Sequence, residues 1–270
     1  MTDIPAQPAQ TSGLTGALVT QGRIINALLF RELQSRFGRL QFGALWLLIE
    51  PLAYAAILTF VKSFIGRNSP IGTSLEIFFF TGLVPYMMFR NLSSRLLGAI
   101  DNNRALLYLP IITNIDVILA RAFLEISILG VAFIIWMSAL WGLNLQYIPD
   151  DPLKFLSALG AAMLLGMGLG TLNAVIAGVM PTWGKIVPWI MRAMFITSGV
   201  LWSNARFPHE LMQYLSWNPL LHVVEWSRSG FYAEYESTIL DRSYVLFVGA
   251  ALWACGLVLE RLLQRQLSIR

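Results

Sequence analysis

The chain has 270 residues, of which 56% are hydrophobic and only 13% charged, and its mean hydropathy is +0.63. This composition is too apolar for a water-soluble domain to cover, so it excludes a soluble globular protein and indicates a membrane protein. The net charge of +4 does not indicate a nucleic-acid partner, because the basic residues stand beside apolar segments instead of forming a soluble basic face.

The N-terminal segment is predicted to stay in the cytoplasm. Residues 1–16 are polar and lack the basic-then-apolar order of a cleaved signal peptide. Residues 14–37 then place leucine and isoleucine among polar and basic residues, as a helix lying in the membrane interface does. This helix is either a simple anchor or a functional gate. The chain therefore divides into a tail with an interfacial helix, 1–38, and a single transmembrane domain, 39–270.

Six segments are apolar enough to cross a bilayer as helices of about 20 residues, which predicts an all-α membrane protein with six transmembrane helices. Lys and Arg are concentrated in the segments on one side of these spans, whereas the loops on the other side mix fewer bases with acids. This bias places both termini in the cytoplasm. The predicted spans are residues 40–64, 75–97, 115–143, 155–179, 186–203 and 244–263.

Two connections between the spans are predicted to be structured. The cytoplasmic link 100–114 carries a turn of helix, with Asp101 or Asn102 as its N-cap. The external segment 207–241 is too long for a simple turn and too polar to span, and prolines divide it into two short helices, 210–217 and 221–232. Such a pair can re-enter the membrane only where protein or water shields its backbone.

Polar residues in the first two spans are candidates for a substrate path, because ionisable groups in a membrane are costly. Trp46, Glu50 and Tyr54 share one stripe of the first span, and Tyr86, Arg90 and Ser94 share one face of the second. A guanidinium such as Arg90 can bind a phosphate or a carboxylate on an anionic substrate. The alternative is structural: Glu50 pairs with a neighbouring span, Trp46 is an interface anchor, and Arg90 pairs or contacts lipid.

The later spans carry weaker candidates. Arg121 and Glu125 lie one turn apart in the third span and can neutralise each other, which favours a structural role. The fifth span offers Trp189, Arg192, Ser198 and Trp202 as further, weaker path candidates. A row of small residues on the fourth span predicts close helix packing: Ala158, Ala162, Gly166, Gly170, Ala174 and Gly178.

An enzyme is not favoured. Both histidines, His209 and His222, fall in the external segment, and Ser198 lacks the Gly-x-Ser-Gly arrangement of an intramembrane hydrolase. The single cysteine, Cys255, and the absence of a His-Glu-x-x-His motif leave no predicted metal site. A secondary transporter stays open as an alternative, although neither inverted halves nor paired broken helices are evident.

The order of motifs resembles the permease subunits of type-2 ATP-binding-cassette exporters, particularly those for capsular polysaccharide. The resemblance covers the whole chain after the first dozen residues. Each motif alone is weak, and their order along a six-span chain is what indicates the family. The motifs are Gly43-Ala44-Leu45-Trp46, Glu50-Pro51, Phe80-Thr81-Gly82-Leu83-Val84-Pro85-Tyr86, the link 103–110, Ser198-Gly199-Val200 and Trp217-Asn218-Pro219-Leu220.

This resemblance implies a homodimer in the bacterial inner membrane, above two copies of a cytoplasmic ATPase that binds the ATP and Mg. No cofactor is expected in this chain. The link 101–109 would be the coupling helix, the N-terminal helix the gate, and the external segment 207–235 a re-entrant pair. The residues that the resemblance assigns to coupling are Asp101, Asn103, Arg104, Leu107 and Tyr108, and those on the gate helix are Arg23, Arg31 and Arg36.

The cargo implied by the resemblance is a polysaccharide, lipid-linked and anionic. Sugar rings can lie on aromatic planes while their hydroxyls take hydrogen bonds, which suits the aromatic path candidates. Related exporters carry O-antigen, teichoic acid or drugs, and the spans do not separate these cargoes. Periplasmic or outer-membrane export proteins are further expected partners.

Overall fold

The computed structural model describes residues 14–37, 49–50, 53–54, 56–61, 69–72, 74–142, 148–203 and 208–269, and these residues contain helices but no strand. Residues 49–50, 53–54 and 56–61 are helical. The other helices in chain order are α1 (Leu14–Phe37), α3 (Leu75–Leu97), the 3-10 turn η1 (Asp101–Asn103), α4 (Arg104–Leu107), α5 (Asn114–Gly142), α6 (Pro152–Val179), α7 (Trp183–Thr197), α8 (His209–Leu215), α9 (Pro219–Phe231) and α10 (Arg242–Ile269).

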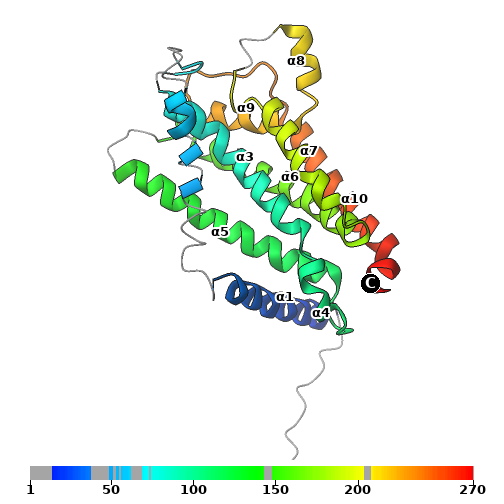
Figure 1. The fold of residues 1–270 in the computed structure, drawn as a ribbon. Coiled ribbons are helices and arrows are strands. Elements are labelled where there is room, and N and C mark those ends of the chain that lie inside the picture. The colour runs from blue at the N-terminus through cyan, green and yellow to red at the C-terminus, as the bar shows by residue number, and fades with distance from the viewer. Residues whose placement is uncertain are drawn as a thin grey trace, which may run out of the picture.

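Helices α1, α4, α8 and α9 lie at the two ends of a bundle formed by other long helices (Figure 1). Figure 1 shows α1 and α4 at one end and α8 and α9 at the other, with α3, α5, α6 and α10 running between them. The C-terminal end of α10 lies toward the end that holds α1 and α4. The predicted interfacial helix 14–37 is present as α1, and the two predicted external helices are present as α8 and α9.

Helix α6 packs between α3 and α10 through glycines that allow the backbones to approach. A Cβ added at Gly166 would lie 2.9 Å from the carbonyl oxygen of Phe89 on α3, and one at Gly168 would lie 2.6 Å from that of Gly249 on α10. Gly170 faces α3, and Gly178 lies against Leu267 of α10. The predicted row of small residues therefore lies in these two interfaces.

Helix α9 is almost entirely buried although it carries charged residues. Arg228 donates to the carbonyl oxygens of Gly199, at 2.8 Å, and Trp202, at 3.2 Å, and it pairs with Glu225 at 3.2 Å. These bonds tie α9 to the turn that follows α7, where Gly199 has a φ of +76°. Burying a charge is tolerated here because it is paired and hydrogen-bonded.

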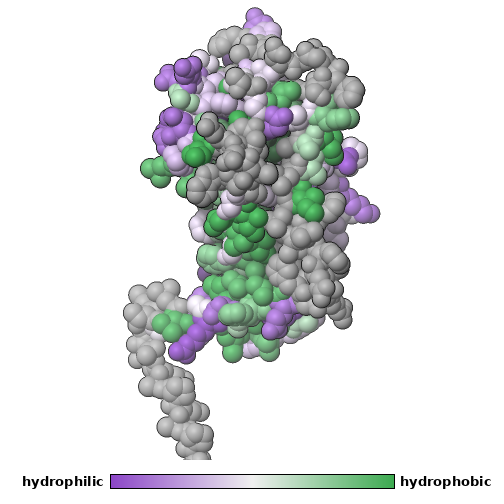
Figure 2. Space-filling model, turned by 90° about the vertical axis from the view of Figure 1, so that its left-hand side faces the viewer, coloured by the Kyte–Doolittle hydropathy of each residue, from purple (hydrophilic) through white to green (hydrophobic). Residues whose placement is uncertain are grey.

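Three of the described helices are long and apolar enough to cross a membrane: Asn114–Ser138, Pro152–Val179 and Arg242–Leu267. They coincide with the predicted third, fourth and sixth spans. Helix α3 matches the second predicted span, and most of the first, 40–64, lies outside the described residues. Helix α7 ends at Thr197, short of the predicted 203, because the backbone turns at Gly199. Figure 2 shows hydrophobic patches across the middle of one face, between hydrophilic side chains toward either end.

Candidate functional site

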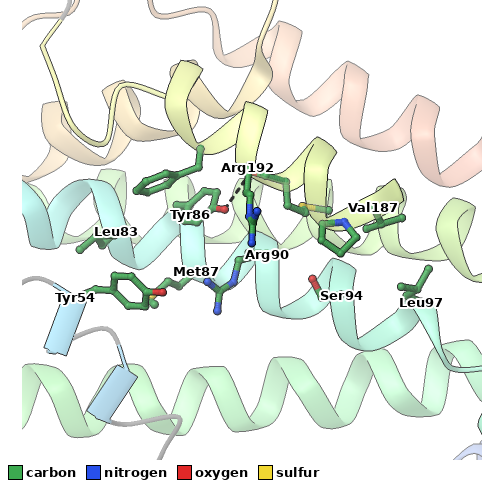
Figure 3. Close-up of a pocket in the computed structure, with 12 residues that line it drawn as sticks. Tyr54, Leu83, Tyr86, Met87, Arg90, Ser94, Leu97, Val187 and Arg192 are labelled. Carbon is green, nitrogen blue, oxygen red and sulfur yellow. Dashed lines mark hydrogen bonds between the residues drawn. The ribbon is translucent and has the colours of Figure 1, made fainter. Parts of the chain in front are cut away.

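A pocket of 380 Å³ lies between α3 and α7 and is closed on one side by Tyr54 (Figure 3). We call it the α3–α7 pocket. Its walls combine aromatic, aliphatic and cationic side chains. The residues that line it are Tyr54, Leu83, Tyr86, Met87, Arg90, Ser94, Leu97, Val187, Pro188, Met191, Arg192 and Phe195.

The wall from α3 carries Tyr86, Arg90 and Ser94 at steps of four residues, so successive turns present them on one face. The Tyr86 hydroxyl donates to the carbonyl oxygen of Met191 on α7 at 3.2 Å. Its ring lies against Phe195, with centroids 4.8 Å apart. These contacts fix α3 and α7 to each other along one edge of the pocket.

Arg90 forms an ion pair with Glu50, and both side chains are mostly buried. The structure therefore shows the structural alternative that was predicted for Glu50, which is pairing with a neighbouring helix. Arg90 lines the pocket at the same time, so pairing does not remove it from the site. Tyr54, one turn after Glu50, reaches the pocket beside Arg90. A bound anion would pair with Arg90 alongside Glu50, or it would displace Glu50 from Arg90.

The wall from α7 includes Arg192, which the sequence suggested only weakly. Pro188, Met191, Arg192 and Phe195 recur at three and four residues, which is the spacing of one helix face. Figure 3 shows Arg192 on α7 facing Arg90 on α3. This spacing in the sequence could have identified Arg192 as a pocket residue, because it places Arg192 on one helix face with Pro188, Met191 and Phe195 and places Trp189 on the neighbouring face.

Two of the predicted tryptophans, Trp189 and Trp202, do not line this pocket. Trp189 is 68% exposed and stacks beneath the guanidinium of Arg192 at 5.1 Å. Trp202 follows α7, and its indole nitrogen donates to the carbonyl oxygen of Ile196 at 2.9 Å. Trp46 lies outside the described residues. The structure thus brings together Glu50, Tyr54, Tyr86, Arg90 and Ser94 and leaves Trp189 and Trp202 elsewhere.

The link that was predicted to be cytoplasmic forms η1 and α4, and neither has a side-chain cap. Asp101 instead accepts from Arg104 at 2.8 Å, while the buried Asn103 donates to the carbonyl oxygen of Ala99 at 2.9 Å. Leu107 is half-buried at the end of α4, whereas the next residue, Tyr108, is 78% exposed. The link is a small knob with an exposed apolar tip.

Helix α1 meets this knob through Arg31, which donates to Asn103 at 2.9 Å. Arg23 is exposed on the same helix. Arg36 also belongs to α1, but its side chain lies outside what the structure describes. The contact joins the predicted gate helix to the predicted coupling segment.

The chemistry of these residues is that of binding. Among the described residues, no group of three or more His, Cys, Asp or Glu side chains is placed to hold a metal ion. His222 has both ring nitrogens occupied, by the carbonyl of Ser216 at 2.7 Å and the backbone N–H of Asp241 at 3.1 Å. Tyr235 lies between α9 and α10, outside the predicted spans. Burial raises the pKa of Tyr235, and the neighbouring Glu225 carboxylate raises it further. Tyr235 therefore acts as a neutral donor to Glu225.

Comparison with known proteins supplies the family. Residues 23–232 match the family described as ABC-2 type transporter, which is well over half of the chain. The chain belongs to the ABC-2 type transporter family. The matched residues run from α1 to the end of α9, so they include both walls of the α3–α7 pocket and the knob.

Curated relatives match this ABC-2 protein over nearly its full length. The polysialic acid transport protein KpsM of Escherichia coli is 30% identical over 236 residues, covering 85% of this chain and 92% of its own. The capsule polysaccharide export inner-membrane protein CtrC of Neisseria meningitidis serogroup A is 31% identical over 241 residues, covering 89% and 91%. BexB of Haemophilus influenzae, with the same description, is 30% identical over 245 residues, covering 91% and 92%.

Proposed function

We propose that this ABC-2 protein is the membrane permease of an ATP-driven exporter that carries a capsular polysaccharide across the bacterial inner membrane. The similarity to three relatives named for capsule or polysialic acid transport, along about nine-tenths of the chain, carries this proposal. The α3–α7 pocket supports it, because aromatic, hydroxyl and guanidinium groups there can bind anionic sugars. The alternatives are an exporter of O-antigen, teichoic acid or a drug, and a secondary transporter.

The proposed topology has six spans, with both termini in the cytoplasm. The excess of Lys and Arg in the segments assigned to the inner side supports this orientation. Helix α1 then lies in the inner interface and α9 re-enters from the outer side. Burial of α9 among α3, α6 and α10 supports re-entry, because protein shields its backbone.

Two copies of the chain would enclose the path, and two cytoplasmic ATPase subunits would bind the ATP and Mg. The knob supports docking of an ATPase, since Tyr108, Leu109 and Ile111 present apolar side chains at the end where α1 and α10 also lie. Movement of this knob would be passed to α3, which leads into it and lines the pocket. The path would thereby open alternately to either side.

A lipid-linked, anionic polysaccharide suits the charge of the pocket. Arg90 is neutralised by Glu50, while Arg192 from the facing wall adds a second cation. An acidic sugar can pair with these guanidiniums while its ring lies on Tyr54 or Tyr86. Periplasmic and outer-membrane export proteins would receive the polymer after it leaves the path.

The test is deletion of the gene in its own host, followed by measurement of polysaccharide at the cell surface and inside the cell. Wild-type chain is expected to restore surface polymer, whereas an Arg90→Ala, Arg192→Ala variant leaves polymer inside. Arg261→Ala, which removes an exposed arginine on α10 that does not line the pocket, serves as the matched control. Surface polymer unchanged by the deletion refutes the proposal.

A further inference from the structure

A second pocket, of 590 Å³, lies between α1, the end of α3 with the turn that follows it, and α5. We call it the α1 pocket. Ser94 lines both this pocket and the α3–α7 pocket, so the two spaces border the same side chain on α3. The lining of the α1 pocket is Arg31, Glu32, Ser35, Ser94, Arg95, Gly98, Asn102, Asn103, Arg121 and Glu125.

Three helices each contribute one guanidinium to the α1 pocket: Arg31 from α1, Arg95 from α3 and Arg121 from α5. Two carboxylates, Glu32 and Glu125, offset them, so three positive and two negative groups leave one positive charge. Arg95 is exposed, and its side chain has no hydrogen-bond or ion-pair partner among the residues that the structure describes. The pocket therefore holds a cation available to a ligand.

Arg121 obtains its partner from another helix. Its side chain is only 9% exposed and pairs with Glu32 of α1, which is 21% exposed at the pocket edge. Arg121 also donates to the backbone carbonyl of Arg95 at 3.4 Å. A buried guanidinium that loses its anion is strongly destabilised, so whatever replaces Glu32 has to carry negative charge.

Helix α1 is held to the rest of the chain by polar contacts and by a small apolar face, on which Ile24 and Ile25 pack against the core. Glu32 pairs with Arg121, Arg31 bonds to Asn103, and Gln21 donates to Asp116. Leu28 is its buried hydrophobic side chain among the described ones, and much of the helix is exposed. The Glu32–Arg121 pair is the charged tie between α1 and α5 that lies in this pocket, and an anion that competes for Arg121 would weaken it.

We propose that the α1 pocket binds an anionic phosphate or carboxylate group, which takes the place of Glu32 on Arg121 and loosens α1 from α5. Arg95 and Arg31 complete the site, because guanidinium forks match both oxyanions bidentately. Only the identity of the natural ligand rests on the proposed function: this ligand would be the charged end of the exported polymer or of its lipid. Binding at this point would free α1 beside the α3–α7 pocket.

The experiment measures amide hydrogen exchange in α1 for the full chain in phosphatidylcholine nanodiscs. Inorganic phosphate in solution and phosphatidylglycerol in the disc are the two probes. We expect faster exchange in the second half of α1 with at least one probe. A response to phosphatidylglycerol alone identifies a lipid headgroup, and a response to phosphate alone identifies a soluble anion.

Variants separate this site from general electrostatics. Arg95→Ala removes an exposed side chain and should abolish the response. Glu32→Gln removes the ion pair itself, so exchange in α1 should be fast without any probe and change little when a probe is added. Arg261→Gln, which changes an exposed arginine in the C-terminal part of α10, should respond like wild type. An unchanged response in Arg95→Ala, a wild-type response in Glu32→Gln, or no response to either probe overturns the proposal. Because no transport is measured, these outcomes leave the export proposal to its own test.

Discussion

The close contact between α3 and α6 makes Gly166→Ala a quantitative test of the packing. The new Cβ would lie 2.9 Å from the carbonyl oxygen of Phe89 and 3.2 Å from its Cα and from the Cβ of Leu92. Two of these three atoms belong to the backbone of α3 and cannot rotate away. Overpacking of this kind costs about 1–3 kcal/mol, so the helices must separate or the variant must lose stability.

Gly160→Ala is the matched control on the same helix. A Cβ at Gly160 meets no atom within 4 Å, and alanine in a helix interior is favoured over glycine by roughly 0.5–1 kcal/mol. The two variants should therefore differ by about 1.5–4 kcal/mol in the free energy of unfolding. Reversible unfolding of the purified chain in mixed micelles, followed by circular dichroism, measures this difference. Equal stabilities would show that α3 and α6 do not pack as described.

Three further predictions concern the knob and the buried cluster around α9. Tyr108→Ser should weaken co-purification of the ATPase, whereas Tyr214→Ser, equally exposed at 78% but at the opposite end, should not; equal retention would place docking elsewhere. Arg228→Met should cost about 3–5 kcal/mol in chemical unfolding because it leaves Glu225 buried and unpaired, and changing both to apolar residues should recover most of the loss. Because the pKa of Tyr235 is raised in the folded chain, the unfolded chain ionises first, and stability should fall as pH rises from about 9 to about 11; the same slope in Tyr235→Phe would contradict this.

The sequence predicted those elements whose signal is local. Residues 14–37 alternate apolar and polar groups along one helix, and the structure has α1 over the same residues. Prolines stand at the start of α8 and α9, and Asn218, which accepts from Leu220 at 3.0 Å, fixes where α9 begins. The stripe of Tyr86, Arg90 and Ser94 follows from helical periodicity alone and faces one pocket.

Features that depend on contacts between helices were missed or misplaced. Arg121 was predicted to pair with Glu125 in its own helix, and nothing in the sequence indicated Glu32, which pairs with Arg121 from α1, nearly ninety positions earlier in the chain. Trp189 was chosen for its chemistry, but the rotation of α7 turns it away and brings Arg192 to the pocket. The end of α7 was placed too late because the positive φ at Gly199 interrupts an apolar run. Spacing along one chain carries no information on which neighbour a side chain will meet.

Transport in vesicles tests the central claim most directly. Inside-out membrane vesicles that contain the chain and its ATPase would be supplied with labelled capsular polysaccharide in the presence or absence of ATP. The account predicts ATP-dependent accumulation of polymer inside the vesicles, reduced in the Arg90→Ala, Arg192→Ala variant and retained in Arg261→Ala. Accumulation that is independent of ATP and driven by an ion gradient would contradict it and favour a secondary transporter.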